Sequence, residues 1–267
     1  MSDVITLTVE RGVATLLLNR AEKRNAVTYD MWVAIGEHCR RLARDAGARV
    51  LVVRGAGAHF CAGADIAGLQ AADRSYGEAN LEAETALMEF PKPTIAFVQG
   101  ACVGGGVQIA TSCDLRIADQ TARFGITPAR LGIIYPAPAL ARVVKLTGPS
   151  AAKHLLYSAE LITAERALRI GLIDELHEPG EAETRLQAFV TLLAEERSPL
   201  TQQASKEMID AIVADGRVGD ACTARWSAEL AAAPDPKEGV AAFLERRPPR
   251  FTWTGIGPSS RPLPPEE

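Results

Sequence analysis

The feature that most constrains this chain is a pair of apolar runs that end in small residues. Arg49 to Arg54 and Pro93 to Val98 are nearly continuous apolar runs bounded by glycine or proline, as is typical of buried strands. Each run leads into a segment rich in glycine and alanine, FCAGADI at Phe60 to Ile66 and GACVGGGVQIA at Gly100 to Ala110. A helix is expected to follow each segment. This repeated order of strand, turn and helix predicts an α/β core with functional backbone at the strand ends.

The two glycine-rich segments can present backbone N–H groups to a ligand, because no side chain intervenes. A helix that opens inside the glycine run at Gly104 to Gly106 would add the positive end of its dipole. Two such N–H donors form an oxyanion hole, which stabilises negative charge developing on a carbonyl oxygen. The segments therefore indicate chemistry at a carbonyl group.

The two ends of the chain differ in pattern. Val4 to Val9 and Val13 to Leu18 alternate around a Glu-Arg-Gly turn and predict a hairpin, and Thr28 to Arg44 predicts a helix capped by Thr28. After Ser150 the strand pattern disappears. The segments with helical spacing from there on are Ser150 to Tyr157, Thr163 to Ile170, Glu181 to Glu196, Pro199 to Ala214, Gly219 to Ala231 and Lys237 to Arg246.

These patterns predict three regions. We expect an α/β core over residues 1–198 and a helical C-terminal region over residues 199–253. The remaining residues, 254–267, are rich in proline, glycine and serine and are expected to be disordered.

Composition limits the classes of function. The chain has 267 residues, 47% of them hydrophobic and 23% charged, which describes an ordinary globular protein. Its net charge of -4 provides no basic surface for nucleic acid, and its longest apolar runs have the length of strands, so we expect neither a nucleic-acid nor a membrane partner. The alternating VITLTV pattern at the start leaves no room for a signal peptide, which favours a cytoplasmic location. The five cysteines and four histidines lack the spacing of metal ligands, so we expect buried free thiols and no metal.

Six segments, in order along the chain, carry a resemblance to a known family. They are LLLNRAEKRNAVT, VLVVRGAGAHFCAGADI, KPTIAFVQGACVGGGVQIATSCDLRIAD, ARFGITPARLGI, ITAERALRIGLIDE and EGVAAFLERRPPRF. From about Asp3 to Trp253 the chain resembles the enoyl-CoA hydratase/isomerase (crotonase) superfamily. The resemblance implies repeated ββα units, a helical C-terminal region that packs over the active site or a neighbouring subunit, and homotrimers often paired into hexamers. It implies an acyl-CoA substrate and no cofactor apart from the coenzyme A of that substrate.

The resemblance also assigns roles to single residues. The N–H groups of Ala64 and Gly105 would form the oxyanion hole. The Ala62 carbonyl would accept from the adenine amino group, and Arg24 and Ala26 would line the pantetheine and phosphate path. The full set expected to bind substrate or coenzyme A is Arg24, Ala26, Ala62, Gly63, Asp65, Ile66, Gly104 and Pro128. For Asp65, an N-cap of the following helix is the alternative.

Two positions depart from the hydratases of this family. Those enzymes carry one catalytic glutamate two residues after the glycine triplet and a second in an FGxPE segment, and here the positions hold Gln108 and Pro128. Gln108 can form hydrogen bonds but has no titratable proton, and Pro128 has neither a side-chain donor nor a backbone N–H. We therefore do not expect efficient hydration by the two-glutamate mechanism.

Three functions remain open. The first is a lyase or isomerase that acts through a thioester enolate, with Gln108 at the site and a proton shuttled by Tyr135 or by a group between Asp73 and Glu89. The second is a decarboxylase, because TPARLGIIYP at Thr127 to Pro136 resembles the methylmalonyl-CoA decarboxylase branch, in which the tyrosine helps to hold the substrate carboxylate. That branch has a glutamate at the position of Gln108 and a histidine at that of Ala64. The third is an acyl-CoA binding protein without catalysis.

Overall fold

The computed structural model describes residues 4–65 and 74–255, and it contains a six-stranded sheet. The strands lie in the order β1 (Ile5–Glu10), β2 (Val13–Leu18), β3 (Val50–Gly55), β4 (Thr94–Val98), β6 (Leu115–Asp119) and β9 (Glu175–His177). Strand β1 pairs antiparallel with β2, and all other neighbours are parallel. The predicted hairpin and both predicted buried strands are confirmed.

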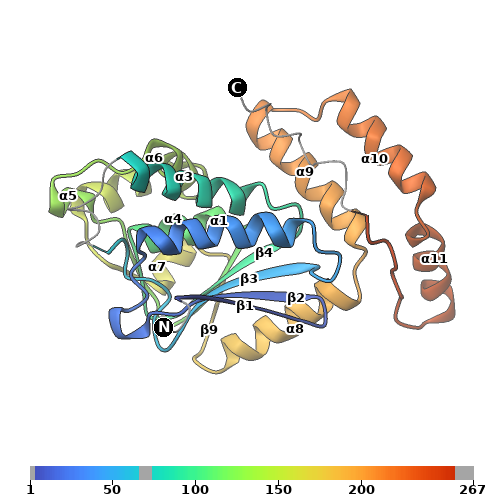
Figure 1. Ribbon diagram of the computed structural model, residues 1–267, viewed down its shortest axis with the longest axis horizontal. Coiled ribbons are helices and arrows are strands. Elements are labelled where there is room, and N and C mark those ends of the chain that lie inside the picture. The colour runs from blue at the N-terminus through green and yellow to red at the C-terminus, as the bar shows by residue number, and fades with distance from the viewer. Residues whose placement is uncertain (1–3, 66–73, 256–267) are drawn as a thin grey trace.

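Helices cover both faces of this sheet, as Figure 1 shows. Helices α1 (Tyr29–Ala43) and α3 (Arg74–Met88) lie on one face, and α8 (Glu181–Glu195) lies on the other. Successive side chains of β3 point to opposite faces of the sheet, and both faces are apolar, so helices must cover both. Leu51 belongs to the main core, whereas Val52 packs in the cluster with α8. The Thr28 hydroxyl accepts from the Met31 N–H at 3.3 Å, which confirms the predicted cap of α1.

A second, three-stranded sheet holds the segments that the sequence pattern did not predict as strands. It consists of β5 (Ala101–Val103), β7 (Arg123–Gly125) and β8 (Ile162–Thr163). The expectation that strands end at Ser150 is wrong, because β8 and β9 both follow that residue. Strands of two or three residues are too short to show alternation, so they leave no periodic signal.

The remaining helices of the core are α4 (Gly105–Ser112), α5 (Pro128–Leu131), α6 (Ala137–Ser158) and α7 (Ala164–Arg169). Helix α6 contains the predicted Ser150 to Tyr157 segment as its second half. Gly148, at φ 75°, separates the two halves with a kink. The order β4, β5, α4 and then β6, β7, α5 shows the expected repetition of ββα units.

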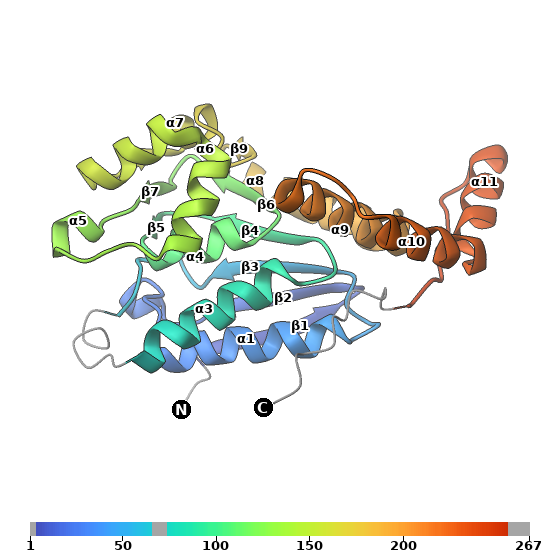
Figure 2. The same ribbon diagram turned by 90° about the horizontal axis from the view of Figure 1, so that it is seen from above.

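The helical C-terminal region is confirmed. Helices α9 (Pro199–Asp215), α10 (Asp220–Ala232) and α11 (Asp235–Glu245) extend to one side of the core, and Figure 2 places α11 at the opposite end of the molecule from α5. These helices have a small apolar cluster of their own, built on Leu200, Trp226 and Trp253. The proposed boundary at residue 198 and the disordered tail stay predictions, since residues 256–267 lie outside the described part. No helix in residues 4–65 and 74–255 is long and apolar enough to cross a membrane.

Candidate active site

The two glycine-rich segments lie side by side. The Cys61 N–H donates to the Ala101 carbonyl at 2.8 Å, and the Val103 N–H donates to the Cys61 carbonyl at 2.9 Å, so the segments form a parallel bridge. On its other side the first segment pairs with Val27, which donates to the Gly63 carbonyl and accepts from the Asp65 N–H, both at 2.8 Å. These contacts hold the first segment beside the start of α4.

This pairing leaves two backbone donors unused at one place. Because Gly63 and Asp65 both bond to Val27, the Ala64 N–H between them points away from Val27. Gly105 is the first residue of α4, so its N–H has no partner within the helix. A methyl group added at Gly105 would lie 3.3 Å from the Ala64 nitrogen. Neither N–H donates to any residue in the described part of the chain. The predicted pair of Ala64 and Gly105 therefore lies close together at the start of α4.

Glycine is required at two positions of this turn. Gly104, the N-cap of α4, has φ 52° and ψ -107°, a conformation that side chains strongly disfavour. At Gly106 a methyl group would lie 2.4 Å from the Cys61 carbonyl oxygen. Only glycine allows α4 to approach the neighbouring segment this closely, and this approach places Gly105 next to Ala64.

The residues predicted for the coenzyme A path also lie together. The Arg24 carbonyl accepts from the Ala62 N–H at 2.9 Å, and the Ala26 carbonyl accepts from Nη1 of Arg20 at 2.8 Å. Asp65 forms an ion pair with Arg20 at 2.7 Å. Ile66, and the helix that Asp65 would cap, lie outside the described residues.

Gln108 and Tyr135 are close to the same helix end. Gln108 lies three residues after Gly105, on the same face of α4, and its side chain leans toward the helix N-terminus. The Tyr135 hydroxyl donates to the Gly104 carbonyl at 3.3 Å, and burial raises the pKa of Tyr135 above its usual value. Pro128 begins α5, and its carbonyl accepts from the Ile133 N–H at 3.2 Å.

The structure adds a buried polar network that the sequence reasoning did not identify residue by residue. Glu84 on α3 is 1% exposed and forms an ion pair with Arg142 on α6. The Asn80 amide donates to Glu84 Oε1 at 3.0 Å and to Gln108 Oε1 at 3.4 Å. Burial raises the pKa of Glu84, although Arg142 and Asn80 act to lower it. Glu84 falls in the segment between Asp73 and Glu89 in which a proton-carrying group is expected.

A signal for this network is present in the sequence. Asn80 and Glu84 are four residues apart, and Ala83 and Leu87 on the same helix are apolar, so helical spacing places all four toward one face. Arg142, 58 residues after Glu84, carries no such signal, because only the packing of α6 brings it near.

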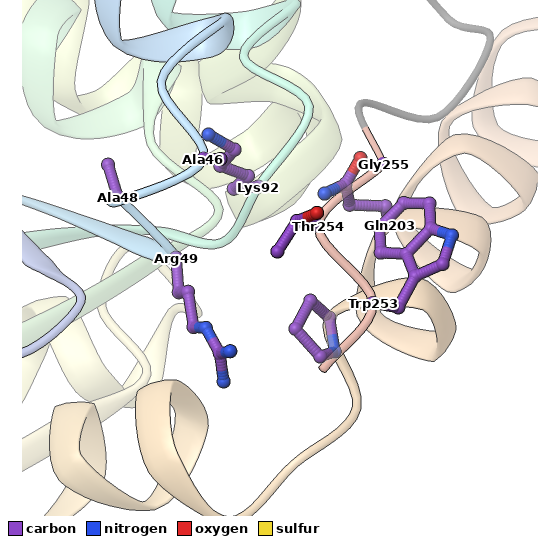
Figure 3. Close-up of a pocket in the computed structure, with 9 residues that line it drawn as sticks. Ala46, Ala48, Arg49, Lys92, Gln203, Trp253, Thr254 and Gly255 are labelled. Atoms are coloured by element: carbon purple, nitrogen blue, oxygen red, sulfur yellow. The ribbon is translucent and has the colours of Figure 1, made fainter. Parts of the chain in front are cut away.

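Two hollows lie elsewhere on the molecule. Figure 3 shows the first, between Lys92 and Arg49 of the core and Gln203, Trp253 and Thr254 of the C-terminal region. Its volume of about 10 Å³ leaves room for about one water molecule. The second, of about 230 Å³, runs along β1, β2, β3 and α8. None of the predicted site residues lines either hollow.

Comparisons with known proteins identify the family to which the chain belongs. The family model for enoyl-CoA hydratase/isomerase matches residues 8–254. The crotonyl-CoA hydratase of Syntrophomonas wolfei is 31% identical, over 92% of this chain and 97% of that protein. The 2,3-dehydroadipyl-CoA hydratase of Escherichia coli is also 31% identical, over 94% of this chain and 99% of that protein. A solved structure of an enoyl-CoA hydratase/isomerase family member superposes with a TM-score of 0.87 at 36% identity, covering 93% of this chain and 98% of that one. The chain therefore belongs to the enoyl-CoA hydratase/isomerase family.

Proposed function

We propose that this protein binds an acyl-CoA thioester and stabilises the enolate of its acyl group with the N–H groups of Ala64 and Gly105. The convergence of these two donors at the start of α4 is the observation that carries the proposal. An enolate places negative charge on the thioester oxygen, and two preorganised donors together with a helix N-terminus stabilise that charge.

The reaction that forms the enolate differs from hydration by two glutamates. Gln108 and Pro128 occupy the positions where the hydratases of the family carry carboxylates, and neither residue can exchange a proton through its side chain. The proposal is therefore a lyase or isomerase. In support of the decarboxylase alternative, loss of CO₂ forms an enolate without a general base. The Tyr135 hydroxyl donates its one hydrogen to the Gly104 carbonyl, so it would have to turn away from that carbonyl to hold a substrate carboxylate.

The first test measures hydration of crotonyl-CoA by the wild-type protein, with binding of the same thioester confirmed in the same preparation. We expect binding without rapid turnover. A turnover of ~10 s⁻¹, typical of enzymes, would show that another group replaces the glutamates and would contradict the proposal. Binding with no turnover in hydration, isomerisation, decarboxylation and thioester-hydrolysis assays would instead identify an acyl-CoA binding protein.

We also propose that the chain forms a homotrimer, alone or paired into a hexamer. Apolar side chains are exposed at both ends of the molecule: Ile134, between α5 and α6, is 94% exposed, and Phe243 on α11 is 82% exposed. Different patches at opposite ends favour head-to-tail contacts that close into a ring. Light scattering should give three or six times the chain mass, and Phe243→Asp should reduce it; a wild-type monomer would contradict this proposal. The cytoplasmic location stays a prediction.

A further inference from the structure

The amide of Gln108 is held in one orientation by the buried network behind it. Asn80 Nδ2 carries two hydrogens, and it donates to Glu84 Oε1 at 3.0 Å and to Gln108 Oε1 at 3.4 Å. Because the Gln108 oxygen accepts from Asn80, its NH₂ group points to the other side of the amide plane. That NH₂ group donates to none of residues 4–65 and 74–255.

The position of Gln108 on α4 determines where this NH₂ group lies. Residues three apart share a helix face, so the Gln108 side chain lies on the same side of α4 as Gly105, one turn from the helix N-terminus. Side chains also lean toward the helix N-terminus, which brings the amide toward the acyl group bound at Ala64 and Gly105. An NH₂ group can donate but cannot take up a proton, so it requires an oxygen acceptor on the ligand.

We propose that Gln108 recognises a carbonyl or carboxylate oxygen on the β-carbon of the acyl group, and that Asn80, Glu84 and Arg142 are positioning residues that fix its amide. The preferred ligand class is then a β-carbonyl acyl-CoA of the malonyl or 3-oxoacyl type. This inference rests on the proposed acyl-CoA function and specifies the ligand of the same site.

The ion pair behind Asn80 gives this arrangement its rigidity. Glu84 is 1% exposed and is held by Arg142 from α6, while Asn80 and Glu84 both belong to α3. If the Asn80 amide reversed, its oxygen would face the carboxylate of Glu84, and two acceptors would meet without a hydrogen between them. The oxygen acceptor of Glu84 therefore selects the orientation of Asn80, and Asn80 selects that of Gln108.

The test compares the affinities of malonyl-CoA and butyryl-CoA, measured by competition against a fluorescent acyl-CoA, with the recovered thioester identified after each titration. The wild-type protein should bind malonyl-CoA about tenfold more tightly. Gln108→Met, which keeps the size of the side chain, and Asn80→Leu, which frees the Gln108 amide to turn, should each remove this preference. Both should leave butyryl-CoA affinity within about twofold. Glu82→Gln, which changes an exposed carboxyl on the same helix, is the matched control and should keep the preference.

The outcomes separate the two proposals. A wild-type protein that binds neither thioester contradicts the acyl-CoA function itself. Binding of both thioesters with equal affinity, or a preference that survives in either folded variant, Gln108→Met or Asn80→Leu, leaves that function standing and overturns the proposed recognition. Thermal unfolding of each variant identifies any that fail to fold, and either folded variant alone is sufficient for the test. Glu84→Gln keeps an oxygen acceptor for Asn80, whereas Glu84→Leu removes it. A preference for malonyl-CoA that is present in Glu84→Gln and absent in Glu84→Leu would show that Glu84 acts as an acceptor for Asn80, a role that packing alone would not require.

Discussion

Replacing Gly105 with alanine should remove function while leaving the fold intact. The added methyl group would lie 3.3 Å from the Ala64 nitrogen, and 3.4 Å from both the Gly63 carbonyl carbon and Cζ2 of Trp32. These contacts are tight but not impossible. The cost of overpacking, about 1–3 kcal/mol, is partly offset by the better helix propensity of alanine, by up to about 1 kcal/mol. The free energy of unfolding should therefore fall by no more than about 2 kcal/mol.

The effect on the oxyanion site should be larger. A substrate oxygen must approach each donor nitrogen to about 2.7–3.1 Å, and a carbon already 3.3 Å from the Ala64 nitrogen occupies the space that this approach needs. Loss of one such donor costs about 2.7–4 kcal/mol of stabilisation, which corresponds to a rate about 100-fold to 1,000-fold lower. Any reaction found for the wild-type protein should slow by at least this factor.

The assay need not await identification of that reaction. A cinnamoyl-type CoA thioester absorbs at longer wavelength when its carbonyl is polarised, so the shift on binding reports the oxyanion hole directly. We expect a red shift with the wild-type protein and little shift with Gly105→Ala. Gly77→Ala is the matched control, because Gly77 lies in helix α3 and an added methyl group there meets nothing within 4 Å. An equal red shift in folded Gly105→Ala would refute the assignment of this amide.

Three further predictions concern other parts of the molecule. Gln108→Glu should raise crotonyl-CoA hydration by about 100-fold, because it restores one acid/base group, and a folded variant without any gain would contradict the explanation given for weak hydration. Arg142→Met should lower the free energy of unfolding, measured in urea, by about 3–5 kcal/mol, since it leaves Glu84 buried and unpaired. The double variant Arg142→Met with Glu84→Leu should recover much of this loss. If the single and double variants lose equal stability, the ion pair does not have this role. Burial lowers the pKa of Lys92 from 10.5 to about 8. Between these pH values the unfolded chain binds more protons than the folded one, so the free energy of unfolding of the wild-type protein should rise with pH relative to that of Lys92→Met. A constant difference between the two proteins across that range would show an unshifted pKa.

Much of the fold could be predicted from the sequence, because its longer elements have clear periods. The hairpin of β1 and β2 follows from alternation, the strands β3 and β4 from nearly continuous apolar runs, and the C-terminal helices from helical spacing. Strands β5, β7 and β8 could not be predicted in this way. They span two or three residues each and exist because neighbouring segments supply their hydrogen-bond partners.

The candidate site shows the same division between local and non-local information. The two glycine-rich segments could be singled out because the small residues that a backbone site requires are visible in the sequence, whereas the choice of Ala64 and Gly105 within them follows from the family resemblance. The network of Asn80, Glu84 and Arg142 depends on the packing of α3 and α6 against α4, and 58 residues separate the two charges. Helical spacing places Asn80 and Glu84 on one face, but no local pattern marks Arg142 as the partner of Glu84.

The buried charges argue that the site does more than hold a thioester. Binding of coenzyme A and an apolar acyl chain needs no ion pair behind Gln108, and a buried pair contributes little stability compared with apolar residues of similar size. An apolar core at positions 84 and 142 would therefore serve a simple binding protein equally well. What the pair supplies is a fixed orientation for Asn80 and, through it, for the side-chain amide of Gln108. A fixed donor beside an oxyanion hole is useful where a second oxygen must be held while charge develops on the first, as in cleavage of a β-carbonyl acyl group.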